Sequence, residues 1–120
     1  MIDGMDSFVD EIKSELEKEL ASEIKNDSDR AILSSKIAGA YRAVKRKRNY
    51  QSHHTEDFIN EDMENLYDIV KELALYDYNM VGAEGETNHS ENGISRTWRS
   101  RDEILRQVIP FAKVFGSGTY

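Results

Sequence analysis

Two histidines and two carboxylates lie together at His53, His54, Glu56 and Asp57, in the stretch HHTED. Imidazole nitrogens and carboxylate oxygens are common ligands of divalent metals. Adjacent histidines point in different directions, however, and His89 lies in a predicted loop far along the chain. The chain contains no cysteine, so a thiolate ligand and a cysteine nucleophile are both excluded. We therefore expect no metal and no other cofactor.

Catalytic patterns of other kinds are also missing from the sequence. It contains no G-x-S-x-G turn for a serine nucleophile and no Gly-Lys-Ser/Thr phosphate loop. Its serines, histidines and aspartates show no spacing that stands out from chance. We expect a protein that is not an enzyme and has no catalytic residues.

A basic run, Lys45 to Arg48, has two interpretations. Cations at the C-terminal end of a helix interact favourably with the helix dipole, so the run can have a purely structural role that neutralises acidic neighbours. The alternative is a nucleic-acid-binding patch. No aromatic residues are interleaved with the run and the chain carries a net charge of −7, which favours the structural interpretation.

Charges of opposite sign occupy separate blocks of the chain. Residues 3–29 contain ten acidic and three basic side chains, whereas residues 30–48 contain seven basic and none acidic. Residues 56–86 then contain ten acidic and one basic. Acidic helices packed around a basic one would neutralise this pattern within one subunit, and contacts between copies would neutralise it in an assembly.

Apolar spacing predicts an all-α fold, a small bundle of three to four helices in a single domain spanning residues 1–120. Residues every fourth position over 7–24 form one apolar stripe, and a second helix opens at NDSD (26–29) and ends in KRKRN. The longest periodic segment, 55–81, predicts one central helix that ends at Gly82. No apolar run is long enough to cross a bilayer, and we expect a soluble protein made in the cytosol.

The segment from Gly82 to Trp98 differs from the helical remainder. Asn92-Gly93 is a strong turn signal, and it joins two short polar arms, so we predict a β-hairpin-like loop between the third and fourth helices. A capping box, Ser100 to Glu103, then opens the fourth helix, which stops before Pro110. An isolated hairpin is marginal in water, which suggests that this loop orders against a partner.

The order of these elements resembles the head-tail connector (head-completion adaptor) proteins of tailed bacteriophages. The resemblance covers residues 66–115, and it rests on an aromatic helix end followed by a G-A-E-G segment, a Ser/Glu-rich loop and an S-R-x-aromatic element. The residues that carry it are Gly82, Ala83, Glu84, Gly85, Ser90, Glu91, Gly93, Ser95, Arg96 and Trp98. Over the first 60 residues only helical character and length agree.

This resemblance implies a virion structural protein that assembles as a ring, typically twelvefold, at the head-tail interface beneath the portal. Its implied partners are other copies of the chain, the portal protein, and the next connector or tail component. The ring would extend the DNA channel and let DNA pass without specific binding, and no membrane would be involved. The main alternative is a small helical regulatory or nucleic-acid-binding protein that uses residues 45–48.

Two sets of residues are candidates for these contacts. We expect the loop to contact the next subunit through Gly82, Glu84, Gly85, Glu86, Glu91, Gly93, Arg96, Trp98 and Arg99. Its glutamates would face Arg96, Arg99 or Arg101 of an adjacent copy. We also expect a flexible C-terminal tail at 111–120, with little local structure to cover its apolar side chains. The portal-binding candidates in this tail are Phe111, Val114, Phe115 and Tyr120.

Overall fold

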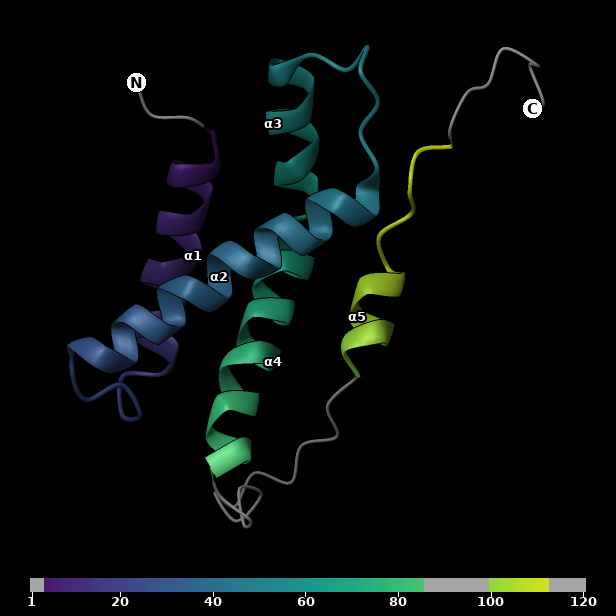
Figure 1. Cartoon of the computed structure of the whole chain (residues 1–120). Coiled ribbons are helices and arrows are strands. Elements are labelled where there is room, and N and C mark those ends of the chain that lie inside the picture. The colour runs from purple at the N-terminus through teal and green to yellow at the C-terminus, as the bar shows by residue number, and fades with distance from the viewer. Residues whose placement is uncertain (1–3, 86–99, 113–120) are drawn as a thin grey trace.

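A computed structural model of the chain describes residues 4–85 and 100–112. These residues form five helices and no strand, which confirms the predicted all-α class (Figure 1). No helix among them is both long and apolar enough to span a membrane. The helices are α1 (Gly4–Glu19), α2 (Asp27–Arg48), α3 (Glu56–Asn65), α4 (Tyr67–Gly85) and α5 (Arg101–Arg106).

The long helix α2 organises the bundle. It crosses α4 in Figure 1, with α1 beside its N-terminal half and α3 near its C-terminal end. Asn26 caps its first turn by accepting a hydrogen bond from the Asp29 amide at 2.9 Å. Asn49 ends it in a left-handed conformation with φ of 63°, the conformation that commonly closes helices. A side chain therefore caps the start of α2, and the backbone N–H of Asn49 closes its end by donating to the Arg46 and Lys45 carbonyls.

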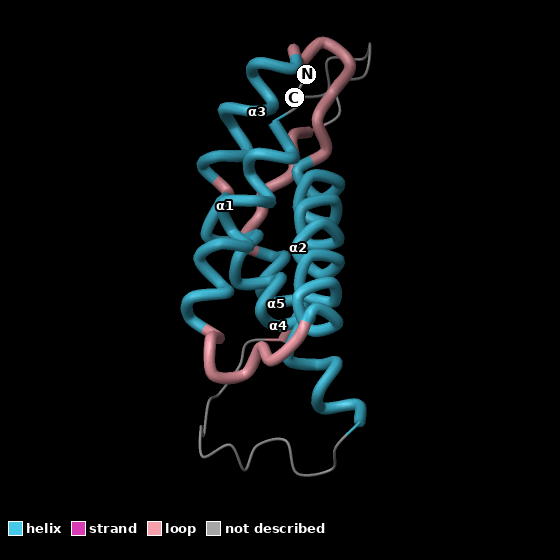
Figure 2. The backbone as a smooth tube through the Cα atoms, turned by 90° about the vertical axis from the view of Figure 1, so that its left-hand side faces the viewer, coloured by secondary structure: helices cyan, strands magenta, loops and turns pink. Residues whose placement is uncertain are grey.

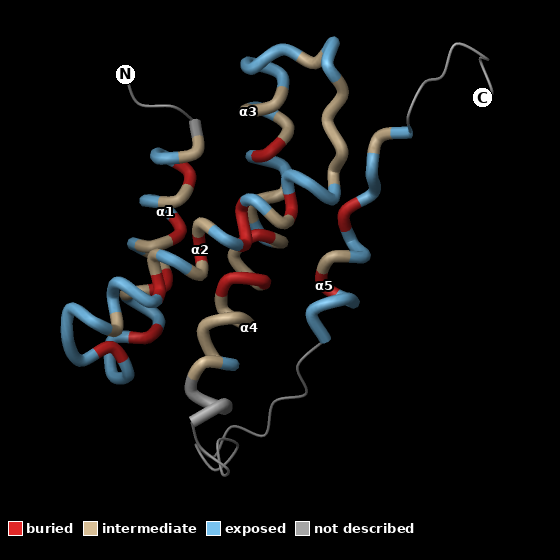
Figure 3. Tube along the Cα trace, in the orientation of Figure 1, coloured by how far each residue is buried: buried red, intermediate tan, exposed pale blue. Residues whose placement is uncertain are grey.

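The core lies where α1, α2 and α4 face one another (Figure 3). Phe8 of α1 packs against Tyr41 of α2 and Tyr67 of α4, with ring centroids 5.2 Å apart in each case. The predicted stripe of α1 is buried as expected, although the helix ends at Glu19 and its last two members lie beyond it. The buried core residues are Phe8, Ile12, Leu16, Leu20, Ile24, Leu33, Ile37, Ala40, Tyr41, Val44, Met63, Val70, Leu73, Ala74, Ile104 and Val108.

Salt bridges connect the helices around this core. Lys71 of α4 lies 3.2 Å from a Glu15 oxygen and 2.7 Å from a Glu19 oxygen, both on α1. Arg101 of α5 pairs with Asp77 of α4 at 3.1 Å. The predicted neutralisation of the basic helix by acidic ones is seen in part, because Arg30 of α2 lies 3.9 Å from Glu17 of α1 and Arg48 of α2 lies 2.8 Å from Asp62 of α3. The expectation that Arg96, Arg99 or Arg101 faces an adjacent copy stays a prediction.

The prediction of one continuous helix over 55–81 is wrong in two ways. The helix is interrupted at Leu66, whose amide donates to the Met63 carbonyl three residues back, at 2.9 Å, in a tight 3₁₀-type turn. No glycine or proline occurs there, so no strong helix-breaking residue accounts for the break. The second error concerns Gly82, which lies inside α4 and does not end it, because the helix continues to Gly85.

The short fourth predicted helix is confirmed as α5. The Ser100 side chain accepts from the Glu103 amide at 3.2 Å, and the Glu103 carboxylate accepts from the Ser100 amide at 2.8 Å. This reciprocal pair is the capping box that the sequence indicated. The predicted hairpin-like loop falls on residues 86–99, which lie outside the described part of the chain.

Gly39 provides a test of how α2 is oriented in the bundle. It is exposed in the middle of the helix, and a Cβ atom built there meets nothing within 4 Å. We expect Gly39→Ala to raise the free energy of unfolding by about 0.5–1 kcal/mol, because alanine loses less backbone entropy on folding. Urea denaturation of dilute protein measures this change. A matched variant at the neighbouring buried position, Ala40→Gly, should be destabilised, and a destabilised Gly39→Ala variant would contradict the orientation.

Candidate functional site: a junction at Arg48 and an unpaired basic surface

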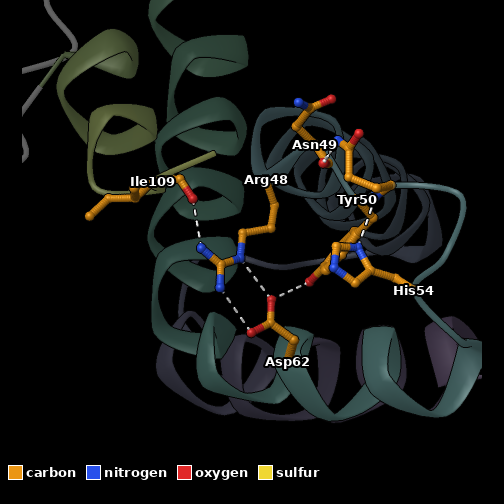
Figure 4. Close-up of polar contacts among 7 residues, drawn as sticks. Arg48, Asn49, Tyr50, His54, Asp62 and Ile109 are labelled. Atoms are coloured by element: carbon orange, nitrogen blue, oxygen red, sulfur yellow. Dashed lines mark hydrogen bonds and ion pairs between the residues drawn. The ribbon is translucent and has the colours of Figure 1, made fainter. Parts of the chain in front are cut away.

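The C-terminal end of α2 is joined to α3 and to the segment after α5 by a network of polar contacts (Figure 4). Arg48 donates from Nε to Asp62 Oδ2 at 2.8 Å and from its second terminal nitrogen to Oδ1 at 3.1 Å. This two-point geometry is the strong form of an arginine–carboxylate contact. The third guanidinium nitrogen donates to the Ile109 carbonyl at 2.6 Å. One side chain of α2 thus contacts two other parts of the chain.

Asp62 accepts a further hydrogen bond, from the Tyr50 hydroxyl at 2.5 Å. The Arg48 guanidinium and this hydroxyl hold the pKa of the Asp62 carboxyl below its usual value. Burial, followed by the neighbouring Asp62 carboxylate, raises the pKa of Tyr50, so its hydroxyl remains a donor at neutral pH. The side chains of Arg48 and Asp62 are only 21% and 12% exposed, so solvent screens this pair far less than a surface pair.

Backbone contacts attach the segment after α5 to the same place. The Phe111 amide donates to the Arg48 carbonyl at 2.8 Å, and Asn49 Nδ2 donates to the Phe111 carbonyl at 3.0 Å. The guanidinium carbon of Arg48 lies 3.9 Å from the centroid of the Phe111 ring, a cation–π contact. We call Arg48, Asn49, Tyr50, His54, Asp62 and Phe111 the Arg48 junction.

His54 belongs to this junction through its ring. The ring is stacked on Phe58 with centroids 4.8 Å apart and lies 4.6 Å from that of Phe111. Its Nδ1 accepts a hydrogen bond from the Gln51 amide at 2.8 Å. Burial, and then the charge of His53, lowers the pKa of His54, so the ring is neutral at neutral pH. No three His, Asp or Glu side chains in the described residues come together in a way that could hold a metal.

The contacts of the Arg48 junction correct the expectation that Phe111 lies in an uncovered tail. Phe111 was expected to lack local cover, but it is half-buried against three aromatic rings and bonded through its backbone. Pro110 ends the helical pattern, and no local pattern after it predicts a second packing contact. The other portal-binding candidates, Val114, Phe115 and Tyr120, lie outside the described residues.

The other predicted interface residues remain untested. Gly82, Glu84 and Gly85 lie on the last turn of α4, and Glu86, Glu91, Gly93, Arg96, Trp98 and Arg99 lie outside the described residues. The structure therefore places three of the nine on a helix where a loop was expected, and the contact of all nine with another subunit stays a prediction.

The basic run divides into one paired residue and three others. Arg48 is neutralised by Asp62, as the structural interpretation predicted. Lys45 lies 5.9 Å from the centroid of the Tyr41 ring. Within the described residues Lys45, Arg46 and Lys47 form no ion pair, so for these three the neutralisation of acidic neighbours stays a prediction. Together with Arg42, Asn49 and Tyr50, the side chains of Lys45 and Arg46 line a shallow groove.

Asp62→Asn tests whether the junction stabilises the fold. An amide would present a donor to groups that are themselves donors and would leave Arg48 without its charge partner, so we expect a loss of about 2 kcal/mol at pH 7. Because folding lowers the pKa of Asp62, its contribution exists above about pH 4 and disappears as pH falls through the folded-state pKa. Urea denaturation of wild type and variant should therefore give curves that converge at low pH.

The control for this experiment is Glu61→Gln, an exposed carboxylate on the same helix. We expect its effect to stay within about 0.5 kcal/mol at both pH values. Equal losses in the two variants would mean that Asp62 contributes no more than a surface charge and would contradict the role of the junction.

Comparison with known proteins identifies a family for the chain. No curated protein and no solved structure is similar to the chain at a significant level. A family model described as phage gp6-like head-tail connector protein matches residues 7–109. The match runs from Ser7, in the first turn of α1, through α5 to Ile109, the residue whose carbonyl Arg48 binds. It extends over the first 60 residues, where the resemblance had rested on helical character alone. The chain therefore belongs to the phage gp6-like head-tail connector family.

Proposed function

We propose that this protein forms a ring at the junction of a phage head and its tail, where it binds the portal and extends the channel for DNA. The observation that carries this proposal is the family match over residues 7–109. The polar contacts in the described residues connect helices to one another, as those of the Arg48 junction do. This arrangement also fits a structural role. We assign the protein no catalytic step and place it in the virion.

Ring closure requires two different surfaces on each subunit, because a head-to-tail contact repeats around an axis. Two groups of exposed charges support such a contact, because they form no ion pair within the described residues of the monomer. One group is the cations near the end of α2, and the other is the carboxylates of α3. The loop around Trp98 is the second candidate for contact between copies. Its single tryptophan is a typical interface anchor amid polar residues.

The alternative function, nucleic-acid binding through residues 45–48, has one observation in its favour. Lys45, Arg46 and Lys47 are exposed and form no ion pair within the described residues. The net charge of −7 opposes it, because an acidic protein repels phosphate at long range. We therefore propose that DNA passes the ring without being held by it.

Assembly is the property that tests the proposed function. Purified protein, alone and with portal, should give rings visible by negative stain and a multiple of the subunit mass by native mass spectrometry. We expect Trp98→Ala to shift the protein towards monomers with little change in helicity or melting temperature, and Trp98→Phe to restore part of the assembly. A wild type that forms no ring under either condition would overturn the proposal. A Trp98→Ala variant that loses cooperative unfolding would instead place Trp98 in the core.

The C-terminal tail gives a separate test of portal binding. A chain that ends after Ala112 keeps Phe111 and all described contacts of the Arg48 junction. We expect it to fold like the wild type and to fail to attach to portal-bearing heads, measured by co-sedimentation. The matched variant Phe111→Ala should melt at a lower temperature and still attach below its transition. Normal attachment of the shortened chain would exclude residues 113–120 as the portal anchor.

A further inference from the structure

The outer surface of α2 carries three cations whose charge is not matched within the described subunit. Arg42, Lys45 and Arg46 are exposed and line one groove, and we call them the basic face. None of the three forms an ion pair with a described carboxylate. Arg42 also lines a shallow hollow with Asp6 and Asp10, and Lys45 lines one with Glu56 of α3. Carboxylates of the same subunit thus lie near two members of the basic face. All three cations are nevertheless exposed, so they can bind an anionic group of another molecule.

The outer surface of α3 carries the opposite charge. Asp57, Glu61 and Glu64 recur at spacings of four and three residues, which places them on one side of the helix, and we call them the acidic face. All three are exposed, and none forms an ion pair within the described residues. Like charges at these spacings repel one another, so the acidic face destabilises an isolated α3 by a few tenths of a kcal/mol per pair.

The helix dipole explains the first acidic residue of α3 but not the other two. Asp57 lies in the first turn, where a negative charge is favourable, whereas Glu61 and Glu64 lie in the second half, nearer the negative end. The last turn of α3 contains no basic residue that could offset them. A cation supplied from outside the subunit would remove this unfavourable arrangement.

The two faces belong to helices that meet at the Arg48–Asp62 contact but occupy different edges of the bundle. In Figure 2 α2 runs along one edge of the bundle, and α3 lies at the upper part of the opposite edge. On α2 the basic residues occupy the side turned away from its buried residues Ile37, Ala40 and Val44. On α3 the acidic residues are turned away from the buried Met63. A surface of each sign on different edges suits repeated head-to-tail contact.

We propose that the basic face of α2 in one subunit binds the acidic face of α3 in the next copy of the same chain. This proposal rests on the proposed ring and identifies the surfaces that close it. The groove beside Arg42 and Arg46 would receive the carboxylates, and arginine is well suited to bind them because its planar head donates two parallel hydrogen bonds. Complementary charge also fixes the direction of assembly, since two basic faces repel each other and so do two acidic faces.

Nucleic acid is the other anion that the basic face could bind. A second copy is favoured because the chain itself supplies the matching carboxylates and because the net charge of −7 repels a polyanion. The two partners separate experimentally, since binding to duplex DNA can be measured on the same variants.

Charge reversal tests the pairing directly. One variant carries Arg42→Glu and Arg46→Glu, and a second carries Asp57→Lys and Glu61→Lys. Each presents two faces of the same sign, so we expect the concentration for half-assembly to rise more than about tenfold. Mixed in equal amounts, the two variants should assemble with alternating subunits and hence in even numbers. A chain carrying all four substitutions should assemble alone.

The matched control is Lys18→Glu with Lys25→Glu, which changes the net charge as much as the first variant at exposed positions away from both faces. It should assemble like the wild type. Circular dichroism and melting confirm that each variant folds, and the neutral pair Arg42→Gln and Arg46→Gln replaces any variant that does not.

The results distinguish three possibilities, namely pairing between copies, nucleic-acid binding and the absence of a ring. Rescue in the mixture, seen by native mass spectrometry, supports the pairing. Assembly of the single-face variants at the wild-type concentration overturns the pairing and leaves the ring intact, as does failure of the mixture to recover. Loss of duplex DNA binding in the Arg42 and Arg46 variant, with unchanged assembly, assigns the basic face to nucleic acid. A wild type that never assembles, with or without portal, overturns the ring and the pairing together.

Discussion

The bidentate contact between Arg48 and Asp62 joins three parts of the chain that are distant in sequence. Arg48 is the last residue of α2, Asp62 lies on α3, and the remaining guanidinium nitrogen binds the carbonyl of Ile109 after α5. The pair is mostly shielded from water, so removing one partner would leave the other charge unpaired in a poorly solvated place. The Tyr50 hydroxyl and the Phe111 ring occupy further sides of the same two groups. The position of the segment after α5 is consequently set by α2, in the first half of the chain.

The same helix links the fold to the proposed assembly. Arg48 points inwards and is neutralised within the subunit, while Arg42, Lys45 and Arg46 point outwards and are not paired with described carboxylates. Acidic residues on α3 divide in the same way, with Asp62 bound to Arg48 and Asp57, Glu61 and Glu64 left on the surface. Charge blocks along the sequence thus have one physical use inside the subunit, and the proposed head-to-tail ring would give the surface charges a second use.

Local sequence patterns predicted the elements whose formation depends on neighbouring residues. Apolar spacing identified α1 and α2 and their buried faces, and the Ser100–Glu103 capping box located the start of α5. Two features had no local pattern to predict them. The break at Leu66 involves no helix-breaking residue, and Phe111 is held by an arginine 63 positions earlier. Pairing of Arg48 with Asp62 was foreseeable only as a general attraction between charge blocks, because nothing local selects Asp62 over its acidic neighbours on α3.

Hydrogen exchange at the Phe111 amide tests most directly whether Arg48 anchors the segment after α5. That amide donates to the Arg48 carbonyl at 2.8 Å, and proline precedes it, so it reports on the attachment of the segment after α5. NMR-detected exchange at neutral pH should find it protected to a degree that approaches that of the core amides of α2, because it opens only when the junction opens. Exchange at the rate of an unstructured peptide, with the α2 core amides still protected, would show that the segment is not anchored and would contradict the central role of Arg48.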